Sequence, residues 1–167
     1  ELNRHGIALL PPDINASEAD FTVEMAAKAA DTVPGAVRYG LAAVKNVGQG
    51  TIAAIVEARA KGGRFRSIDD FVARVHDRHL NKRQLENLVR AGAFDGLDPN
   101  RRRLFEAADV LMRAAGTAAD ARASRQMGLF GRDAAAGVLS LSLPDVEDWP
   151  PMERLRQELE AVGFYLS

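Results

Sequence analysis

The chain has 167 residues, of which 47% are hydrophobic and 27% are charged, and its net charge is −1. This composition predicts a folded domain with an ordinary core and excludes a chain that is disordered as a whole. It contains no cysteine, which excludes disulfides and thiolate metal sites. No apolar run approaches the roughly 20 residues of a membrane helix, and the first residues do not resemble a signal peptide. We therefore expect a soluble, cytoplasmic segment without a membrane partner.

The charge is distributed unevenly. Residues 38–103 contain 14 Lys or Arg and 7 Asp or Glu, whereas the segments on either side each have a net charge of −4. A basic middle suits a polyanionic partner, because cations displace the counterions that condense on nucleic acids. A solvated helical surface explains the same charges equally well.

Residues 1–38 predict a few short β-strands. Gly6–Leu10 is an apolar run that ends at a proline pair, Phe21–Glu24 alternates apolar and polar residues, and Ala36–Tyr39 has the composition of a third strand. Isolated strands are rarely stable, so we expect them to complete a sheet or to pack against a neighbour.

The next segment, residues 40–59, predicts a helix-hairpin-helix, in which a short apolar helix, a tight loop and a second apolar helix follow one another. Val47 would anchor the loop in the core, while Gly48 and Gly50 would permit positive φ angles and a sharp turn. The N–H groups from Gly48 through Gln49 and Gly50 would then face a phosphate, with Lys45 adding charge. Such contacts hold a nucleic-acid backbone without reading bases. The alternative is an ordinary tight turn between packed helices.

A second, more degenerate hairpin follows. Ser67 with Asp70, and Asn81 with Gln84, resemble capping boxes that begin helices, and Asn100 can cap another. The glycine-containing segment 91–97 would turn the chain between the last two helices. Residues 39–115 therefore predict a mainly α fold, a tandem helix-hairpin-helix bundle of five helices.

The second hairpin contributes a second basic group of candidate DNA contacts. Its members are Lys82, Arg83 and Arg90 together with Arg101, Arg102 and Arg103, and the predicted contacts among them are Lys82, Arg83, Arg101 and Arg102. Basic residues at the start of a helix oppose the helix dipole, so Arg101 to Arg103 favour a surface that recruits an anion. A solvated face remains the alternative.

Residues 116–148 predict a mobile linker, because Ala, Gly, Ser and Arg become frequent and hydrophobic periodicity fades. Within it, Gln126, Met127, Leu129 and Phe130 form a short motif. Such a peptide can insert its apolar side chains into a partner's groove while the glutamine hydrogen-bonds, or it can pack on the bundle of its own chain. Residues 149–167 predict a final helix that begins after a proline pair and ends at Gly163.

Catalysis has little support in the sequence. Asp69 and Asp70 are explained by a helix N-terminus, and no third ligand with suitable spacing accompanies them or the acidic segment 145–147. The three histidines, His5, His76 and His79, are isolated in the sequence. We therefore predict no catalytic residue, no metal site and no cofactor in this chain.

Several ordered blocks resemble one family. They are Leu10–Asn15, Tyr39–Gly48, Gly62–Phe65 with Asp70–Phe71, Leu80–Arg83, Ala91–Asp95 and Gly163–Ser167. Together they cover nearly the whole chain, which resembles the bacterial DNA polymerase III alpha subunits, the C-family replicative polymerases.

The resemblance implies a piece of a much larger DNA-directed DNA polymerase. Residues 1–38 would end the fingers region, residues 39–115 would lie over duplex DNA, and residues 149–167 would lead to a further domain. The catalytic aspartates, with the expected magnesium, would belong to a palm domain outside this chain. The implied partners are duplex DNA, the sliding clamp (beta subunit) and other holoenzyme subunits.

The resemblance also implies that Gln126, Met127, Leu129 and Phe130 are the internal clamp-binding motif. Gly128 departs from the family pattern and adds backbone entropy that docking must remove. Two rival hypotheses are a helix-hairpin-helix DNA-repair enzyme, such as a glycosylase, and a purely structural helical scaffold.

Overall fold

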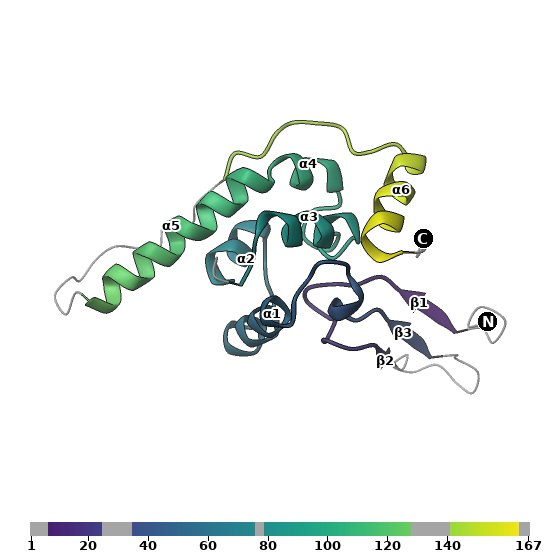
Figure 1. Ribbon diagram of the computed structural model, residues 1–167, viewed down its shortest axis with the longest axis horizontal. Helices are drawn as coiled ribbons and strands as arrows, with labels where there is room; N and C mark the ends of the chain where they lie inside the picture. Colours follow the sequence, from purple (N-terminus) through teal and green to yellow (C-terminus); the bar gives the residue numbers. More distant parts are fainter. Residues whose placement is uncertain (1–6, 25–34, 76–78, 128–140, 164–167) are drawn as a thin grey trace.

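The computed structural model describes residues 7–24, 35–75, 79–127 and 141–163, without the side chains of residues 125–127. In the first of these segments and the start of the second, three strands form a sheet: β1 (Ala8–Leu10), β2 (Thr22–Glu24) and β3 (Ala36–Arg38). β3 lies in the middle, parallel to β1 and antiparallel to β2 (Figure 1). The predicted strands are confirmed, and they pair with one another.

The rest of the described chain is mainly helical, which confirms the predicted fold class. The helices are a single 3-10 turn η2 (Leu41–Ala43), α1 (Gln49–Gly62), α2 (Ile68–Arg74), α3 (Lys82–Arg90), α4 (Arg101–Glu106), α5 (Ala108–Met127) and α6 (Pro151–Val162).

Local capping fixes where three of these helices begin. The Ser67 hydroxyl accepts a hydrogen bond from the Asp70 N–H at 3.1 Å at the start of α2. Asn81 and Gln84 form a reciprocal capping box at the start of α3. The Asn100 side chain accepts from the Arg103 N–H at 2.9 Å at the start of α4. Each cap satisfies a backbone donor that has no partner inside the helix, so the predicted helix starts are confirmed.

The core lies between the helices. α2 packs on α5, and α3 packs on α4, α5 and α6. Phe71 lies at the centre, in edge-to-face contact with Phe65 and Phe94 at ring-centroid distances of 5.1 and 4.9 Å. These rings are almost fully buried, so they hold the two hairpins in one bundle.

The first helix of the first hairpin is short, as expected, and consists of a single 3-10 turn. After the 3-10 turn η2, Val44 adopts an extended backbone, with φ −77° and ψ 123°. This conformation ends the helix and places the Val44 side chain in the core, where it is 1% exposed. Burial of a β-branched side chain therefore replaces a second helical turn.

The predicted linker is wrong for residues 116–127, which continue α5. In Figure 1 this helix projects beyond the body of the bundle. Alanine has the highest helix propensity, and the buried face of α5 contains Ala114, Ala115 and Ala119. A face made of small side chains gives weak hydrophobic periodicity even in a helical segment, which is why the sequence pattern resembles a linker.

The final helix α6 is confirmed and has a position that the sequence did not predict. Pro151 occupies its first position, and Gly163 ends it in the left-handed conformation with φ 97°. α6 packs on α3. It also contacts the loop of the first hairpin, because the Lys45 N–H donates a 2.8 Å hydrogen bond to the Ala161 carbonyl. The C-terminal helix is thus part of the bundle that carries the first hairpin.

Candidate nucleic-acid interface

The loop of the first hairpin has one residue in the core and three residues exposed to solvent. Val47 is buried, as predicted, whereas Gly48, Gln49 and Gly50 are exposed. The positive φ angle of this turn belongs to Asn46, at 63°, and neither Gly48 nor Gly50 has one. The expectation that the glycines make the turn is therefore wrong, because asparagine tolerates the left-handed conformation.

The glycine at position 48 leaves the start of α1 uncovered. Gly48 is the N-cap residue, with φ −79° and ψ 159°, which any residue can adopt, and it forms no side-chain cap. A Cβ built there would lie 3.7 Å from the Gln84 Nε2 atom, so the fold itself leaves room for a side chain. The first N–H groups of a helix have no intrahelical acceptor, and here no side chain of the N-cap residue covers them. This end of α1 can therefore receive an anion at close range.

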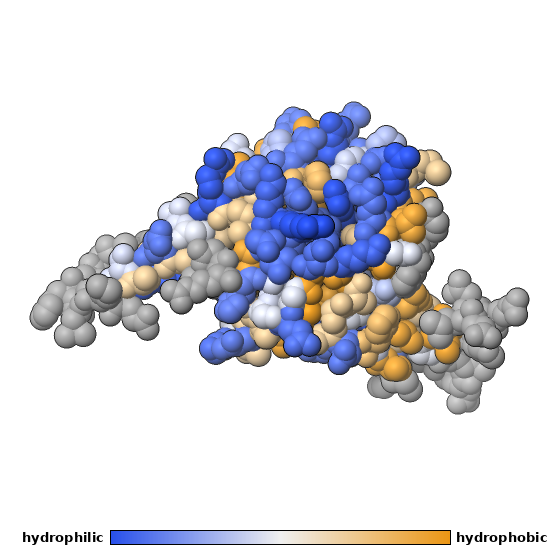
Figure 2. Space-filling view, in the orientation of Figure 1, coloured by the Kyte–Doolittle hydropathy of each residue, from blue (hydrophilic) through white to orange (hydrophobic). Residues whose placement is uncertain are grey.

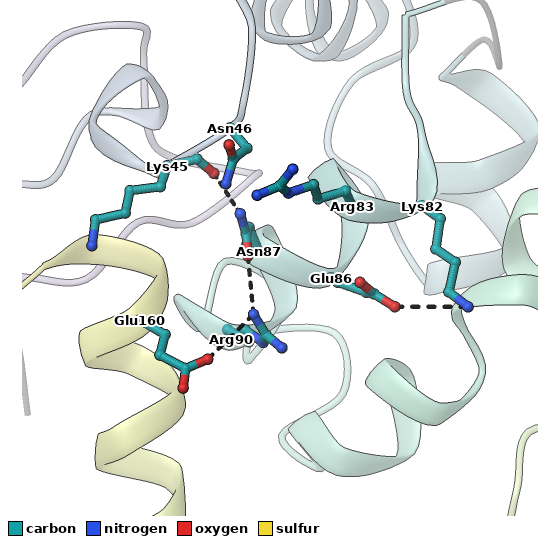
Figure 3. Close-up of a pocket in the computed structure, with 8 residues that line it drawn as sticks. All are labelled: Lys45, Asn46, Lys82, Arg83, Glu86, Asn87, Arg90 and Glu160. Carbon is teal, nitrogen blue, oxygen red and sulfur yellow. Dashed lines mark hydrogen bonds and ion pairs between the residues drawn. The ribbon is translucent and has the colours of Figure 1, made fainter.

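A pocket of about 580 Å³ lies beside this loop. It is lined by Lys45 and Asn46 from the loop, by Glu160 from α6, and by Lys82, Arg83, Glu86, Asn87 and Arg90 from α3 (Figure 3). We call it the basic pocket. On the face shown in Figure 2, hydrophilic residues gather over α3, which agrees with the polar lining.

Asn87 connects the two walls of the basic pocket. Its side chain is buried, at 4% exposure, and its Nδ2 donates a 2.7 Å hydrogen bond to the Lys45 carbonyl. Its Oδ1 lies 3.4 Å from the Arg90 Nη1 (Figure 3). Because Asn87 belongs to α3, its short hydrogen bond to the Lys45 carbonyl fixes the hairpin loop relative to α3.

Two cations of the basic pocket have no carboxylate partner in the described part of the chain. Neither Lys45 nor Arg83 has a carboxylate partner among the described residues, and both are exposed. Lys82, in contrast, contacts Asp109 at 2.8 Å and Glu86 at 3.9 Å. The hydrogen bond to Asp109 raises the pKa of Lys82, so this side chain remains a cation. The pocket therefore offers an anion two cations that no described carboxylate neutralises.

In the second hairpin, Arg101 is buried and paired with carboxylates, so the expectation that it lies on a surface is wrong. Its side chain is 5% exposed, and its guanidinium contacts Asp95 at 2.8 Å and Glu158 at 3.1 Å. Burial opposes its charged form, but the hydrogen bonds to Asp95 and Glu158 outweigh this effect and raise its pKa. Arg101 is thus an interior residue, and we remove it from the candidate interface.

Arg102 is only partly available. Its side chain is half-buried and contacts Glu106 at 2.8 Å, while its backbone N–H donates to the Asp148 carboxylate at 3.1 Å. Arg154 in α6 holds the other oxygen of Asp148. The start of α4 is therefore covered by a carboxylate of its own chain, unlike the start of α1.

The structure therefore brings Lys45, Lys82 and Arg83 together in the basic pocket, with Val47 buried beneath the loop. Neither Arg101 nor Arg102 belongs to the lining of this pocket. Sequence reasoning missed Asn87 and Glu160. The sequence does not single out Asn87, because a polar residue in a helix is usually exposed. It does not single out Glu160, because the position of this side chain depends on how α6 packs on the bundle.

The clamp-motif prediction lies largely outside the described residues. Gln126 and Met127 end α5, but their side chains are not described, and neither Leu129 nor Phe130 is.

No group of three or more His, Asp or Glu that could hold a metal occurs within the described segments. Asp70 contacts Arg74 at 3.0 Å and accepts from the Arg66 N–H, so this carboxylate has structural partners. His79 is exposed beside the first hairpin, and His5 and His76 lie outside the described residues. None of the helices in the described parts is long and apolar enough to span a membrane.

A family model described as a helix-hairpin-helix motif matches residues 6–104. This match covers more than half of the chain, so the chain belongs to the helix-hairpin-helix family.

Curated relatives narrow the assignment. The chain is 44% identical to DNA polymerase III subunit alpha of Caulobacter vibrioides over 100% of its own length. It is 39% identical to the subunits of Escherichia coli K12 and Thermus aquaticus, over 98% and 97% of its length. It spans 14%, 14% and 12% of these three relatives, respectively. The resemblance to bacterial DNA polymerase III alpha subunits is confirmed, and it concerns a segment of those proteins.

Proposed function

We propose that this chain is a non-catalytic segment of a replicative DNA polymerase that holds duplex DNA by its backbone and tethers the polymerase to the sliding clamp. One observation carries the first half: the start of α1, which has no side-chain cap from Gly48, adjoins a pocket whose cations Lys45 and Arg83 pair with no carboxylate of the described residues. The polymerase reaction, with its magnesium, is assigned to a palm domain outside this chain.

The proposed DNA contact has two parts. Backbone N–H groups around Gly48 and Gln49 bind one phosphate, and Lys45 and Arg83 attract the adjoining backbone. Both parts recognise phosphate and not bases, so the contact is independent of sequence, as a replicative enzyme requires. Binding of this kind weakens steeply as salt is added.

The first test changes Gly48 to Asp. The N-cap conformation of Gly48 suits Asp, so G48D keeps the thermal stability of the chain or raises it slightly. Its carboxylate would occupy the place of the phosphate, so duplex binding at low salt is expected to be lost. Retained stability together with lost binding identifies the start of α1 as the contact. Unchanged binding by stable G48D would contradict it.

The second test removes the cations Lys45 and Arg83. K45A/R83A is expected to reduce the slope of log K against log salt by about 1.8, since each phosphate contact contributes about 0.9 on B-DNA. The control is K61A, which removes one charge near the end of α1, where Lys61 contacts Glu57 at 2.5 Å. A double variant with the same slope as K61A would exclude the basic pocket from the interface.

The clamp half of the proposal rests on the motif Gln126, Met127, Leu129 and Phe130 and on its resemblance to the clamp-binding motif of the family. Tethering raises the effective concentration of the polymerase at the clamp, so a modest peptide affinity suffices. In the whole polymerase, F130A is expected to weaken clamp binding by about tenfold or more, as loss of an aromatic anchor does. The control is F21A, which removes an aromatic ring that is 51% exposed and lies outside the core. Unchanged clamp affinity in F130A would refute this half alone.

The rival hypotheses make different predictions. A purely structural scaffold predicts no salt-dependent duplex binding. A glycosylase requires a catalytic Asp and usually a nucleophilic Lys just beyond the hairpin. The first Lys after the α1 start is Lys61, which contacts Glu57, and the nearby Asp70 contacts Arg74. Release of a damaged base from a duplex by this chain would favour the repair enzyme.

A further inference from the structure

The guanidinium of Arg90 is held in place but poorly satisfied. Its Cζ lies 4.8 Å from the centre of the Phe105 ring, a cation–π contact that fixes one face. Its Nη1 lies 3.4 Å from the Asn87 Oδ1 and 3.5 Å from the Glu160 carboxylate. Both distances exceed the usual 2.7–3.2 Å of a protein hydrogen bond. Its Nε is buried and has no hydrogen-bond partner among the described residues.

Such a guanidinium is prepared for an anion. The aromatic ring and Asn87 limit its rotation, so little side-chain entropy is lost when it binds. A phosphate can accept two parallel hydrogen bonds from one guanidinium, which neither of its present long contacts provides. Arg90 also lines the pocket that contains Arg83, which lies about two turns earlier in α3.

Glu160 is the carboxylate that faces Arg90 from α6. Its side chain is half exposed, and α6 reaches the pocket because the Ala161 carbonyl accepts the hydrogen bond from the Lys45 N–H. The remaining charged groups that line the pocket are Lys45, Lys82, Arg83 and Glu86, and Glu86 contacts Lys82. Glu160 is therefore the carboxylate of the described lining that opposes an anion at Arg90 (Figure 3).

We propose that Arg90 is a further phosphate ligand of the basic pocket, and that Glu160 holds it until a phosphate replaces the carboxylate. The phosphate is that of a DNA backbone, so this inference rests on the proposed function. Binding in the pocket and the Glu160 contact of α6 then exclude one another. Because coupling between two binding events is reciprocal, DNA weakens one contact of α6, and this contact weakens the binding of DNA.

The test uses the full 167-residue chain and a short duplex at low salt. E160Q is expected to bind the duplex about two- to five-fold more tightly than the unmodified chain, the range that corresponds to an exposed ion pair. The matched control is E153Q, which removes the same charge from the first turn of α6, where Glu153 contacts Gln157 and Arg156 outside the pocket. This control subtracts the general effect of charge on binding to a polyanion.

A second variant shows whether the effect acts through Arg90. In an R90M background, which keeps an apolar side chain on the Phe105 ring, the gain from E160Q over E153Q is expected to vanish. Equal affinities of E160Q and E153Q would overturn the inference. So would an advantage of E160Q that persists with R90M.

A second measurement separates this inference from the proposed function. The Nε–H signal of Arg90 is followed by NMR while inorganic phosphate or the duplex is added. A shift with both supports the proposal. A shift with inorganic phosphate, but no duplex binding, would retain Arg90 as an anion ligand and refute the DNA function. No shift with either would overturn the assignment of Arg90.

Discussion

Replacement of Arg101 by Met tests the conclusion that this arginine stabilises the interior and does not contact DNA. The side chains of Arg101 and Glu158 are 5% and 1% exposed, so neither charge is solvated. Removal of one partner of a buried ion pair typically costs about 3–5 kcal/mol, because a buried charge loses its compensation. Asp95 remains paired with Arg154 at 3.0 Å, whereas Glu158 loses the guanidinium that contacts it at 3.1 Å. We therefore expect R101M to lower the free energy of unfolding by about 3–5 kcal/mol.

Urea unfolding measures this loss directly. The single tryptophan, Trp149, lies just before α6 and contacts the Phe105 ring at 5.4 Å, so its fluorescence reports detachment of α6. The control is R102M at the next position, where the ion pair with Glu106 is about 40% exposed on both sides and contributes at most about 1 kcal/mol.

Two results would refute this reasoning. One is an equal loss of stability in R101M and R102M, which would mean that the burial of Arg101 has no energetic consequence. The other is a greater reduction of the salt slope of DNA binding in R101M than in R102M, which would return Arg101 to the interface.

Two other predictions concern the backbone and pH. Gly92 has φ 84°, and a Cβ there would lie 2.3 Å from the Arg101 Nη2, so G92A should destabilise the chain by several kcal/mol. The loss should exceed that in G163A, where φ is 97° but the added Cβ meets only the Lys45 side chain, at 3.4 Å. Similar unfolding midpoints of the two variants would contradict this prediction. The hydrogen bond from Arg38 lowers the pKa of Glu24 below 4.5, so the stability that this pair gives the sheet is present above pH 4.5 and is lost as the pH falls through the lowered pKa. A carboxyl NMR titration should therefore give a Glu24 midpoint below 4.5 that rises in R38M, and an ordinary midpoint in the unmodified chain would refute it.

Local signals predicted most of the helix ends. Ser67, Asn81 and Asn100 cap helices as expected, and α6 runs from Pro151 to the residue before Gly163. These signals involve residues within one helical turn, so the sequence contains all the information that they need.

Features that depend on distant residues could not be predicted in this way. Arg101 has the sequence context of a basic surface helix, and its burial requires Glu158, which is 57 residues away. The same holds for the basic pocket, since Lys45 and Arg83 meet only because the bundle places the hairpin loop beside α3. The extension of α5 has another cause: the helix propensity of its alanines favours a helix, whereas its weak hydrophobic periodicity is typical of a linker.

The buried contact between Arg101 and Glu158 also sets an order of events during synthesis. Asp95 leaves the ribosome before Arg101 and can pair with it at once, whereas Glu158 follows 57 residues later, roughly 3 to 11 seconds at bacterial elongation rates. During this interval the second hairpin exposes the surface that α6 later covers. Arg101 therefore becomes fully buried only after α6 has been synthesised. If the ribosome stalls before Glu158, the surface of the bundle that α6 covers stays exposed.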